Sequence, residues 1–182
     1  ERYDRLFAAI AESGVVIAHH LTVTKHLWGT FRRDPTPQKG IFTGLPPSLM
    51  MEPMMWYFLT GILERHPGLK IVWVEPGLFW IPGFLRFLDR RMHQHYDFPG
   101  VKELPSTYWK RQMAVTFVDE PEAIDNRYEL GVENLLWSTD FPHPCCNWPN
   151  AQAKVAEMFK DMPDEETDKI TWGNGARMYG FA

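Results

Sequence analysis

The segment Asn134–Pro144, with the sequence NLLWSTDFPHP, carries the clearest indication of the fold. Its apolar part, Leu135–Trp137, predicts a buried strand, and Asp140 and His143 follow closely after it. A carboxylate and an imidazole are groups that bind metal ions and move protons. Because the carboxyl ends of parallel strands form the catalytic face of many α/β enzymes, this segment points to an enzyme of that class.

Three more apolar segments predict strands of the same kind, and amphipathic segments separate them. The strands are predicted at Val15–His20, Lys70–Glu75, Met113–Val118 and Leu135–Ser138. Helices are predicted at Arg2–Ser13, Ser48–Arg65, Ile81–His95, Pro121–Leu130, Ala151–Asp161 and Glu165–Tyr179. The segment Thr22–Leu49 is rich in Gly, Pro and charge and is predicted to be a long loop. Alternating strands and helices predict an α/β fold with a parallel sheet and right-handed crossovers.

The number of predicted strands limits the architecture. Four strands are too few to close a barrel of eight. The chain is therefore predicted to be either the C-terminal half of such a barrel or an open sheet with helices on both faces. The sequence begins with Glu1 inside a predicted helix that has no capping residue in front of it, which favours a piece of a longer protein. Residues 1–182 are predicted to form one partial domain.

Composition excludes several classes of partner. The formal net charge is −4 at pH 7, so neither nucleic acid nor an anionic membrane surface is an expected partner. The apolar runs are shorter than the roughly 20 residues that span a bilayer. The two cysteines, Cys145 and Cys146, are adjacent and provide no disulfide framework, which favours a reducing, cytoplasmic location. A small-molecule substrate is the expected partner, and a homo-oligomer, in which two chains assemble one barrel, stays open.

Every predicted strand ends in side chains that titrate or bind metals. These side chains are His19 and His20, Glu75, Asp119 and Glu120, and Asp140. His20 and Asp140 are the leading candidates, because an imidazole and a carboxylate from two strands suit a divalent ion such as zinc. Each also has a structural interpretation, since a histidine is often hydrogen-bonded in a core and an aspartate often caps a turn. Two ligands are also fewer than the three that a catalytic zinc takes from its protein.

Two further residues are candidate catalytic groups. His143 could contact a substrate or shuttle a proton near neutral pH, or it could hydrogen-bond the loop backbone. Glu75 could act as a base. Its other interpretation, an ion pair with an arginine of the following helix, is slightly preferred. The arginines in reach are Arg86, Arg90 and Arg91.

Five segments, in this order, resemble the second amidohydrolase family, a group of metal-dependent TIM-barrel enzymes that includes the aminocarboxymuconate-semialdehyde and γ-resorcylate decarboxylases. The segments are GVVIAHHL, HPGLKIVWVEPGLFWIPGFLRFLDRR, LPSTYWKRQMAVTFVDEP, NLLWSTDFPHPCCNWPN and KITWGNGARMYGF. The resemblance implies the fifth to eighth strands of a (β/α)8 barrel. It also implies that His20, rather than His19, and Asp140 bind a divalent metal ion, zinc in the first place and manganese as the alternative.

Two departures from the family pattern bear on function. The H-x-H ligand pair of the family's first strand has no counterpart here, and Glu75 stands about where the decarboxylases carry a catalytic histidine. The resemblance implies a metal-dependent enzyme in which Asp140, His143 and Glu75 act on a small carboxylic or aromatic substrate. Hydrolysis by metal-activated water is the first expectation and non-oxidative decarboxylation the alternative. The present chain by itself is expected to be inactive, and a non-catalytic α/β binding module is the alternative of another class.

Overall fold

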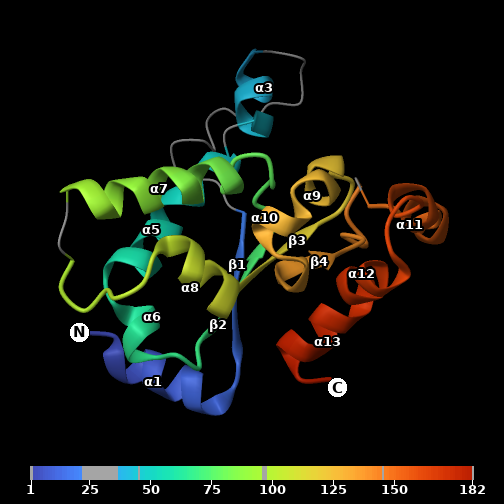
Figure 1. Cartoon of the computed structure of the whole chain (residues 1–182). Helices are drawn as coiled ribbons and strands as arrows, with labels where there is room; N and C mark the ends of the chain where they lie inside the picture. Colours follow the sequence, from blue (N-terminus) through green and yellow to red (C-terminus); the bar gives the residue numbers. More distant parts are fainter. Residues whose placement is uncertain (1, 22–36, 45, 96–97, 145, 182) are drawn as a thin grey trace.

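Four parallel strands form the centre of the molecule. The computed structural model describes residues 2–21, 37–44, 46–95, 98–144 and 146–181. Within these residues the strands are β1 (Val16–His20), β2 (Lys70–Val74), β3 (Met113–Phe117) and β4 (Leu135–Trp137). They lie in the order β1-β2-β3-β4, and each neighbouring pair is parallel (Figure 1). The predicted α/β fold, with its four strands and parallel sheet, is confirmed.

The register of the strands brings their carboxyl ends to one edge of the sheet. His20 lies opposite Val74, and Phe117 lies opposite Trp137. Two backbone hydrogen bonds extend the pairing beyond these ends, from the Leu21 N–H to the Val74 carbonyl at 2.8 Å and from the Ser138 N–H to the Phe117 carbonyl at 2.8 Å. The segments that follow the strands therefore leave the sheet from a common edge.

Helices connect the strands. The α-helices are α1 (Asp4–Ser13), α3 (Pro37–Gly44), α4 (Pro46–Leu49), α5 (Met51–Leu59), α6 (Ile62–Arg65), α7 (Ile81–His95), α8 (Pro105–Gln112), α9 (Pro121–Asp125), α10 (Arg127–Leu130), α11 (Ala151–Met158), α12 (Asp164–Asp168) and α13 (Asn174–Tyr179). A 3₁₀ turn, η1 (Val132–Asn134), precedes β4, and a π-helical segment, η2 (Lys169–Gly173), joins α12 to α13.

Several predicted elements differ in detail from those observed. Part of the predicted loop Thr22–Leu49 is helical, as α3 and α4, while residues 22–36 lie outside the described part. The predicted helix Ser48–Arg65 is interrupted at Gly61, whose φ is 69° and whose position leaves no room for a Cβ beside the Gly100 carbonyl. Helix α8 was not predicted, although Pro105 at its first turn is a usual start signal. The predicted helix Glu165–Tyr179 is divided by η2.

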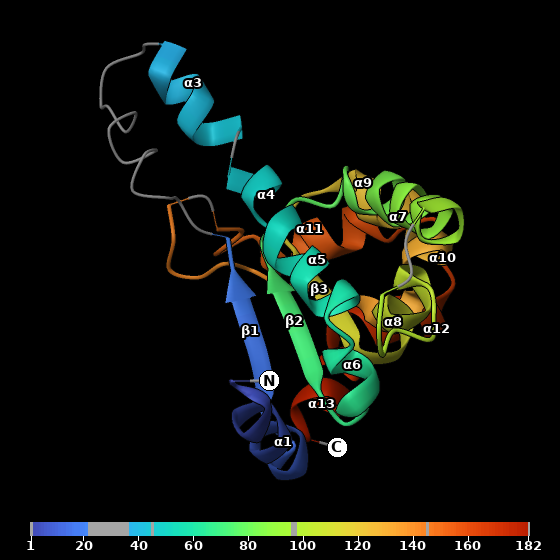
Figure 2. The same cartoon turned by 90° about the vertical axis from the view of Figure 1, so that its left-hand side faces the viewer.

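The two faces of the sheet are covered differently. Side chains such as Trp73, Val115 and Leu135 point to one face and are fully buried against residues of α5, α7 and α8, which lie beside the sheet in Figure 2. The other face carries the small cluster Val72, Ala114 and Leu136, which packs against Met178 of α13. Ala18 and His20 on this face are exposed. Helices along one face fit a barrel segment better than an open sheet covered on both faces.

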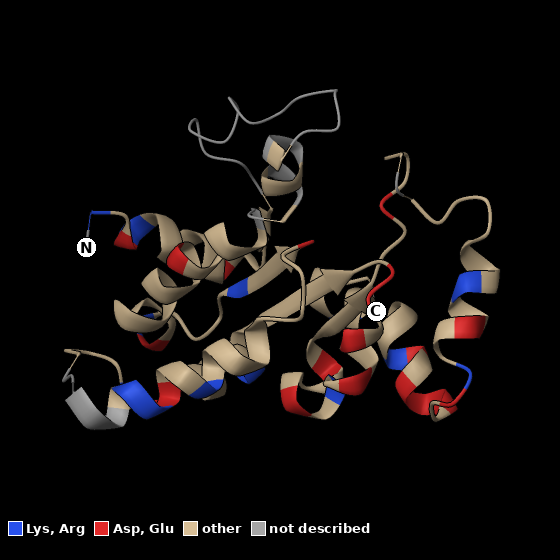
Figure 3. Ribbon diagram, turned by 90° about the horizontal axis from the view of Figure 1, so that it is seen from above, with Lys and Arg blue, Asp and Glu red and all other residues tan. Residues whose placement is uncertain are grey.

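The outer surface of the described residues carries mixed charge. Figure 3 shows Lys and Arg interspersed with Asp and Glu along the outer helices. None of the helices in the described part of the chain combines the length and the apolar character that crossing a membrane requires. The expectations about nucleic acid and membrane surfaces stay predictions.

Candidate functional site

The candidate residues converge at the carboxyl edge of the sheet. His20 is the last residue of β1, Glu75 directly follows β2, and Asp140 and His143 lie in the segment after β4. His20 Nε2 lies 3.6 Å from Glu75 Oε2, and His143 Nδ1 lies 2.9 Å from Asp140 Oδ2. The structure therefore brings together all four residues that the sequence marks as site candidates. Their chemical roles stay predictions.

Glu75 and Asp140 share an uncommon backbone conformation. Both have a φ of 55°, and they are the only residues other than glycine with a positive φ in the described part of the chain. This left-handed conformation is unfavourable for residues with a Cβ, and it persists where the surroundings impose it, often at functional sites. The Glu75 N–H donates to Thr116 Oγ1 at 3.1 Å, and the Asp140 N–H makes a long contact with Ser138 Oγ at 3.4 Å. The neighbouring strand β3 thus supports the turn at Glu75, whereas the contact of Asp140 lies within its own segment.

The carboxyl groups of Glu75 and Asp140 lie close enough to influence each other's protonation. Two carboxyl groups at close range disfavour each other's negative charge. Burial raises the pKa of Glu75 and the Asp140 carboxyl raises it further, whereas His20 and His143 act in the opposite direction. Each carboxylate side chain is only 21% exposed, while the two imidazoles are about 60% exposed. The result is a partly buried acid pair between two accessible histidines.

These contacts correct one sequence interpretation. Glu75 was expected to pair with an arginine of α7, but its partners are His20 and Asp140. Arg86, the candidate closest to Glu75 in the sequence, pairs with Glu129 of α10 instead. The ion-pair interpretation is wrong because α7 directs its arginines outward, where Arg86 is 65% exposed.

His20 and His19 point to opposite faces of the sheet, as alternation along a strand requires. His19 Nε2 lies 2.8 Å from the Tyr57 hydroxyl, and the His19 ring stacks on Trp73. Burial lowers the pKa of His19 and raises that of Tyr57 to about 12. His19 is therefore part of the packing between the sheet and α5, and His20 is the histidine that faces the site.

His20 has the geometry of a metal-binding histidine. Its Nδ1 lies 2.7 Å from the Leu21 carbonyl oxygen. A carbonyl only accepts hydrogen bonds, so Nδ1 carries the proton and the neutral ring keeps a free lone pair on Nε2. A backbone carbonyl that fixes the tautomer in this way is the usual support of a metal-bound histidine. With the oxygens of Asp140, this nitrogen gives a donor set that suits zinc or manganese.

The donors present account for part of a metal site. Within the residues that the structure describes, no three His, Cys, Asp or Glu side chains are grouped so as to hold one ion. A catalytic zinc takes three protein ligands. His20 and Asp140 therefore fit a divalent ion as two of its ligands.

A cleft of about 290 Å³ opens beside these groups. It is lined by Glu75, Val118, Asp119, Glu120, Asp140 and His143. Its volume is near the lower limit for small-molecule sites. Sequence reasoning missed the supporting role of Thr116, whose signal was a polar residue on the inner face at the end of β3.

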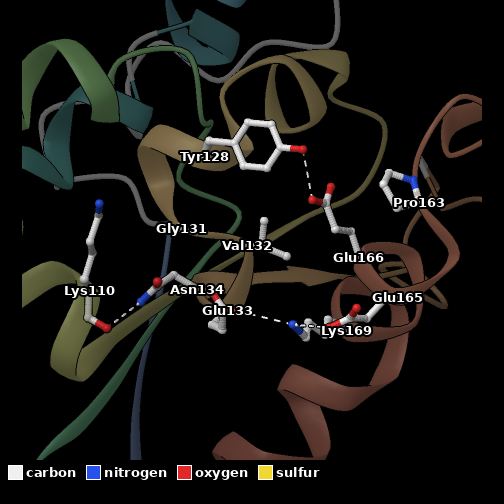
Figure 4. Close-up of a pocket in the computed structure, with 10 residues that line it drawn as sticks. All are labelled: Lys110, Tyr128, Gly131, Val132, Glu133, Asn134, Pro163, Glu165, Glu166 and Lys169. Carbon is white, nitrogen blue, oxygen red and sulfur yellow. Dashed lines mark hydrogen bonds and ion pairs between the residues drawn. The ribbon is translucent and has the colours of Figure 1, made fainter.

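A larger recess of about 750 Å³ lies elsewhere, against η1 and α12 (Figure 4). Its polar side chains mostly satisfy one another. The Tyr128 hydroxyl donates to Glu166 at 2.9 Å, and Lys169 pairs with Glu165 at 2.9 Å and with Glu133 at 3.5 Å. Because η1 leads into the amino end of β4, this recess lies at the end of the strands that serves stability in barrels. We assign it a structural role.

Comparison with known proteins identifies the family. A family model described as amidohydrolase matches residues 1–181. The chain belongs to the amidohydrolase family. This match confirms the resemblance found in the sequence. A comparison with curated protein sequences finds no match.

Solved structures of an amidohydrolase and of two decarboxylases share the fold. An amidohydrolase from Mycobacterium avium subsp. paratuberculosis K-10 is 21% identical, with a TM-score of 0.82 over 99% of this chain and 46% of its own. A 5-carboxyvanillate decarboxylase from Sphingomonas paucimobilis is 25% identical, with a TM-score of 0.64 over 98% of this chain and 54% of its own. A dihydroxybenzoic acid decarboxylase from Polaromonas sp. JS666, solved with manganese and the inhibitor 2-nitroresorcinol, is 18% identical, with a TM-score of 0.72 over 99% and 54%. The chain thus spans about half the length of these proteins, and its fold is a partial TIM barrel.

Proposed function

We propose that this amidohydrolase chain belongs to a metal-dependent enzyme that hydrolyses a small carboxylic or aromatic substrate. The observation that carries the proposal is the connected group of His20, Glu75, Asp140 and His143 at the carboxyl edge of the sheet. It combines a nitrogen and an oxygen donor for a metal with a pair of neighbouring carboxyl groups. Zinc suits these donors, and manganese is the alternative supported by the manganese-containing decarboxylase.

Each residue has a defined task in this proposal. His20 Nε2 and the Asp140 carboxylate would hold the ion, which when bound supplies a Lewis acid that polarises substrate oxygen and lowers the pKa of water. Asp140 would accept the proton of the attacking water. His143, exposed and in contact with Asp140, would exchange that proton with solvent or the leaving group. Glu75, next to Asp140 and His20, would face the substrate.

Decarboxylation is the second candidate. The 25% identity with 5-carboxyvanillate decarboxylase supports it, and so does the raised pKa of Glu75. In this reaction the bond between the ring carbon and the carboxylate carbon breaks, and carbon dioxide leaves. The electron pair stays on the ring carbon, which takes a proton from the Glu75 carboxyl. The donors to the metal would hold the same positions in both reactions.

Metal analysis of the complete protein tests the site. The wild-type protein is expected to retain zinc or manganese after dialysis, and His20→Ala and Asp140→Ala are expected to lose most of it. Asp125→Ala, which changes an exposed aspartate of α9, is the matched control and should retain the metal. Equal metal content in all of these proteins would overturn the assignment of the ligands.

A substrate test separates the reactions. The metal-loaded complete protein is incubated with 5-carboxyvanillate and with dihydroxybenzoates, and released carbon dioxide is measured. Release of carbon dioxide by the wild type, and its loss in Glu75→Gln, would favour decarboxylation. Turnover of ester or amide substrates without carbon dioxide would support hydrolysis. A metal-loaded protein that turns over neither class, but binds aromatic acids, would support the non-catalytic binding module instead.

A further inference from the structure

The turn between β2 and α7 carries Glu75 and is tied to its surroundings at several points. The Glu75 N–H donates to Thr116 Oγ1 of β3 at 3.1 Å. Three residues later, the Leu78 N–H donates to Glu120 Oε2 at 2.7 Å. Within the turn, Trp80 Nε1 donates to the Pro76 carbonyl at 2.8 Å. Both outside acceptors belong to β3 or to the segment that follows it.

Glu120 is well placed to hold this turn. It directly precedes α9, and its own carbonyl accepts the Ala123 N–H at 3.0 Å in the first turn of that helix. Its backbone is therefore fixed, while its carboxylate reaches across to the neighbouring loop. Leu78 is 1% exposed, so its N–H would have no solvent to bond if the carboxylate were removed. A hydrogen bond from a buried N–H to a carboxylate belongs to the stronger class of such bonds.

The turn needs this support because its backbone is unfavourable. Glu75 has a φ of 55° and Gly77 has a φ of 70°, so two left-handed residues lie close together. A left-handed residue with a Cβ persists only where neighbouring contacts determine it. Thr116 fixes the first residue of the turn and Glu120 fixes the fourth, so the turn that begins with Glu75 is held at both ends.

We propose that Glu120 is a positioning residue which, through the Leu78 N–H, holds the turn in the conformation that directs Glu75 toward His20 and Asp140. This inference rests on the proposed function, because it gives Glu120 the support of a group that the proposed reaction uses. Glu120 itself touches neither a metal ligand nor a reacting atom in this account. It acts on the site through the position of Glu75.

The experiment measures the position of Glu75 through the imidazole of His20. The complete protein, free of metal and labelled with ¹⁵N, is examined by imidazole NMR at one fixed neutral pH. The His20 resonances are identified by their loss in His20→Ala. Glu75→Gln defines the shift of His20 Nε2 that follows from losing the neighbouring carboxylate, which lies 3.6 Å away. This readout requires neither metal nor substrate, so its outcome is independent of the metal analysis described above.

The variants separate positioning from general stability. Glu120→Ala should shift His20 Nε2 in the same direction as Glu75→Gln, and it should cause no further shift when added to Glu75→Gln. Glu120→Gln keeps an oxygen that can accept from Leu78 and should leave the wild-type resonance. Glu122→Ala, which changes an exposed glutamate two residues further along the same segment, is the control and should also leave it unchanged.

The opposite results overturn the inference. An unshifted His20 resonance in folded Glu120→Ala would show that Glu75 stays in place without Glu120. An equal shift of His20 in the Glu75→Gln background would show that Glu120 acts by another route. If Glu120→Ala does not fold, Glu120→Asp replaces it, because it keeps the charge and withdraws the acceptor from Leu78. The His20 shift of Glu120→Asp, alone and in the Glu75→Gln background, is then judged by the same criteria.

Discussion

Because the backbone at Glu75 is left-handed, we expect glycine to be more stable than alanine at this position, the reverse of their usual order. Glu75 has a φ of 55°, outside the range that residues with a Cβ prefer. Replacing it by glycine removes the Cβ, whereas replacing it by alanine keeps the Cβ. Both variants lose the same contacts with His20 and Asp140, so these contacts cancel when the two variants are compared. We expect Glu75→Gly to be the more stable variant.

The magnitude follows from two opposing effects. Placing a residue with a Cβ in the left-handed region costs about 1–2 kcal/mol. Glycine loses more backbone entropy on folding than alanine, which costs about 0.4–1 kcal/mol. The midpoints of these ranges leave Glu75→Gly more stable than Glu75→Ala by about 0.8 kcal/mol at a φ of 55°. The prediction depends only on the backbone, and so it tests the geometry of the site independently of its chemistry.

Urea unfolding of the complete protein measures this difference. Arg90 supplies the control, because it is exposed and lies inside the long helix α7. The Arg90→Gly variant is expected to be less stable than Arg90→Ala by about 1 kcal/mol, which is the usual order inside a helix. If the alanine variant at position 75 is as stable as the glycine variant, while the Arg90 pair behaves as expected, Glu75 is not left-handed. The orientation of its carboxyl toward Asp140 would then be refuted.

Three further predictions concern the supports of the fold and the site. Asn134→Ala removes a buried amide that donates to three backbone carbonyls, at 2.7, 3.1 and 3.2 Å, and should cost about 2–4 kcal/mol in urea unfolding; a loss below about 1 kcal/mol would contradict this. Gly131→Ala places a Cβ 2.2 Å from Asn134 Oδ1 at a φ of 95° and should cost about 2 kcal/mol or more, with an unchanged melting temperature as the contrary result. Burial raises the pKa of Glu120, so the folded protein keeps this proton to higher pH than the unfolded chain, and stability falls as pH rises from the ordinary value of 4.5 through the raised one. The unfolding free energy of Glu120→Gln should therefore depend less on pH in this range than that of the wild type. An equal pH dependence in the two proteins would contradict the raised pKa of Glu120.

The sequence predicted the strands well because each is a short apolar run bounded by polar residues. Predicted and observed strand ends differ by at most one residue for all four strands. The same property pointed to the candidate site residues, since polar groups at the end of a parallel strand or shortly after it lie at the carboxyl edge of the sheet. The alternation of side chains also separates His20 from His19 once the neighbours of the strand are known.

The features that the sequence did not reveal depend on contacts between distant segments. The pairing of Glu75 with Asp140 joins residues on different strands, and no local pattern distinguishes it from an ion pair with α7. Gly61 interrupts a helical pattern because the Gly100 carbonyl approaches its Cα, a constraint that lies 39 residues away in the sequence. Thr116 and Glu120 act as acceptors for backbone N–H groups of a neighbouring loop, and their role follows from the register of β2 against β3.

The strand order explains why this site contains two strained residues. Glu75 follows β2 and Asp140 follows β4, and β3 lies between these strands. Strands that are two positions apart are separated by about 10 Å, which is too far for close contact between carboxyl groups of side chains that continue straight along their strands. The backbone turns after β2 and after β4, and each turn contains a left-handed residue, Glu75 or Asp140. The end of β3 contributes no carboxyl to the pair but supplies Thr116, and the segment after it supplies Glu120, which hold one of the two turns. The strain at Glu75 and its support by β3 are thus two parts of one requirement, namely that carboxyl groups from non-neighbouring strands meet.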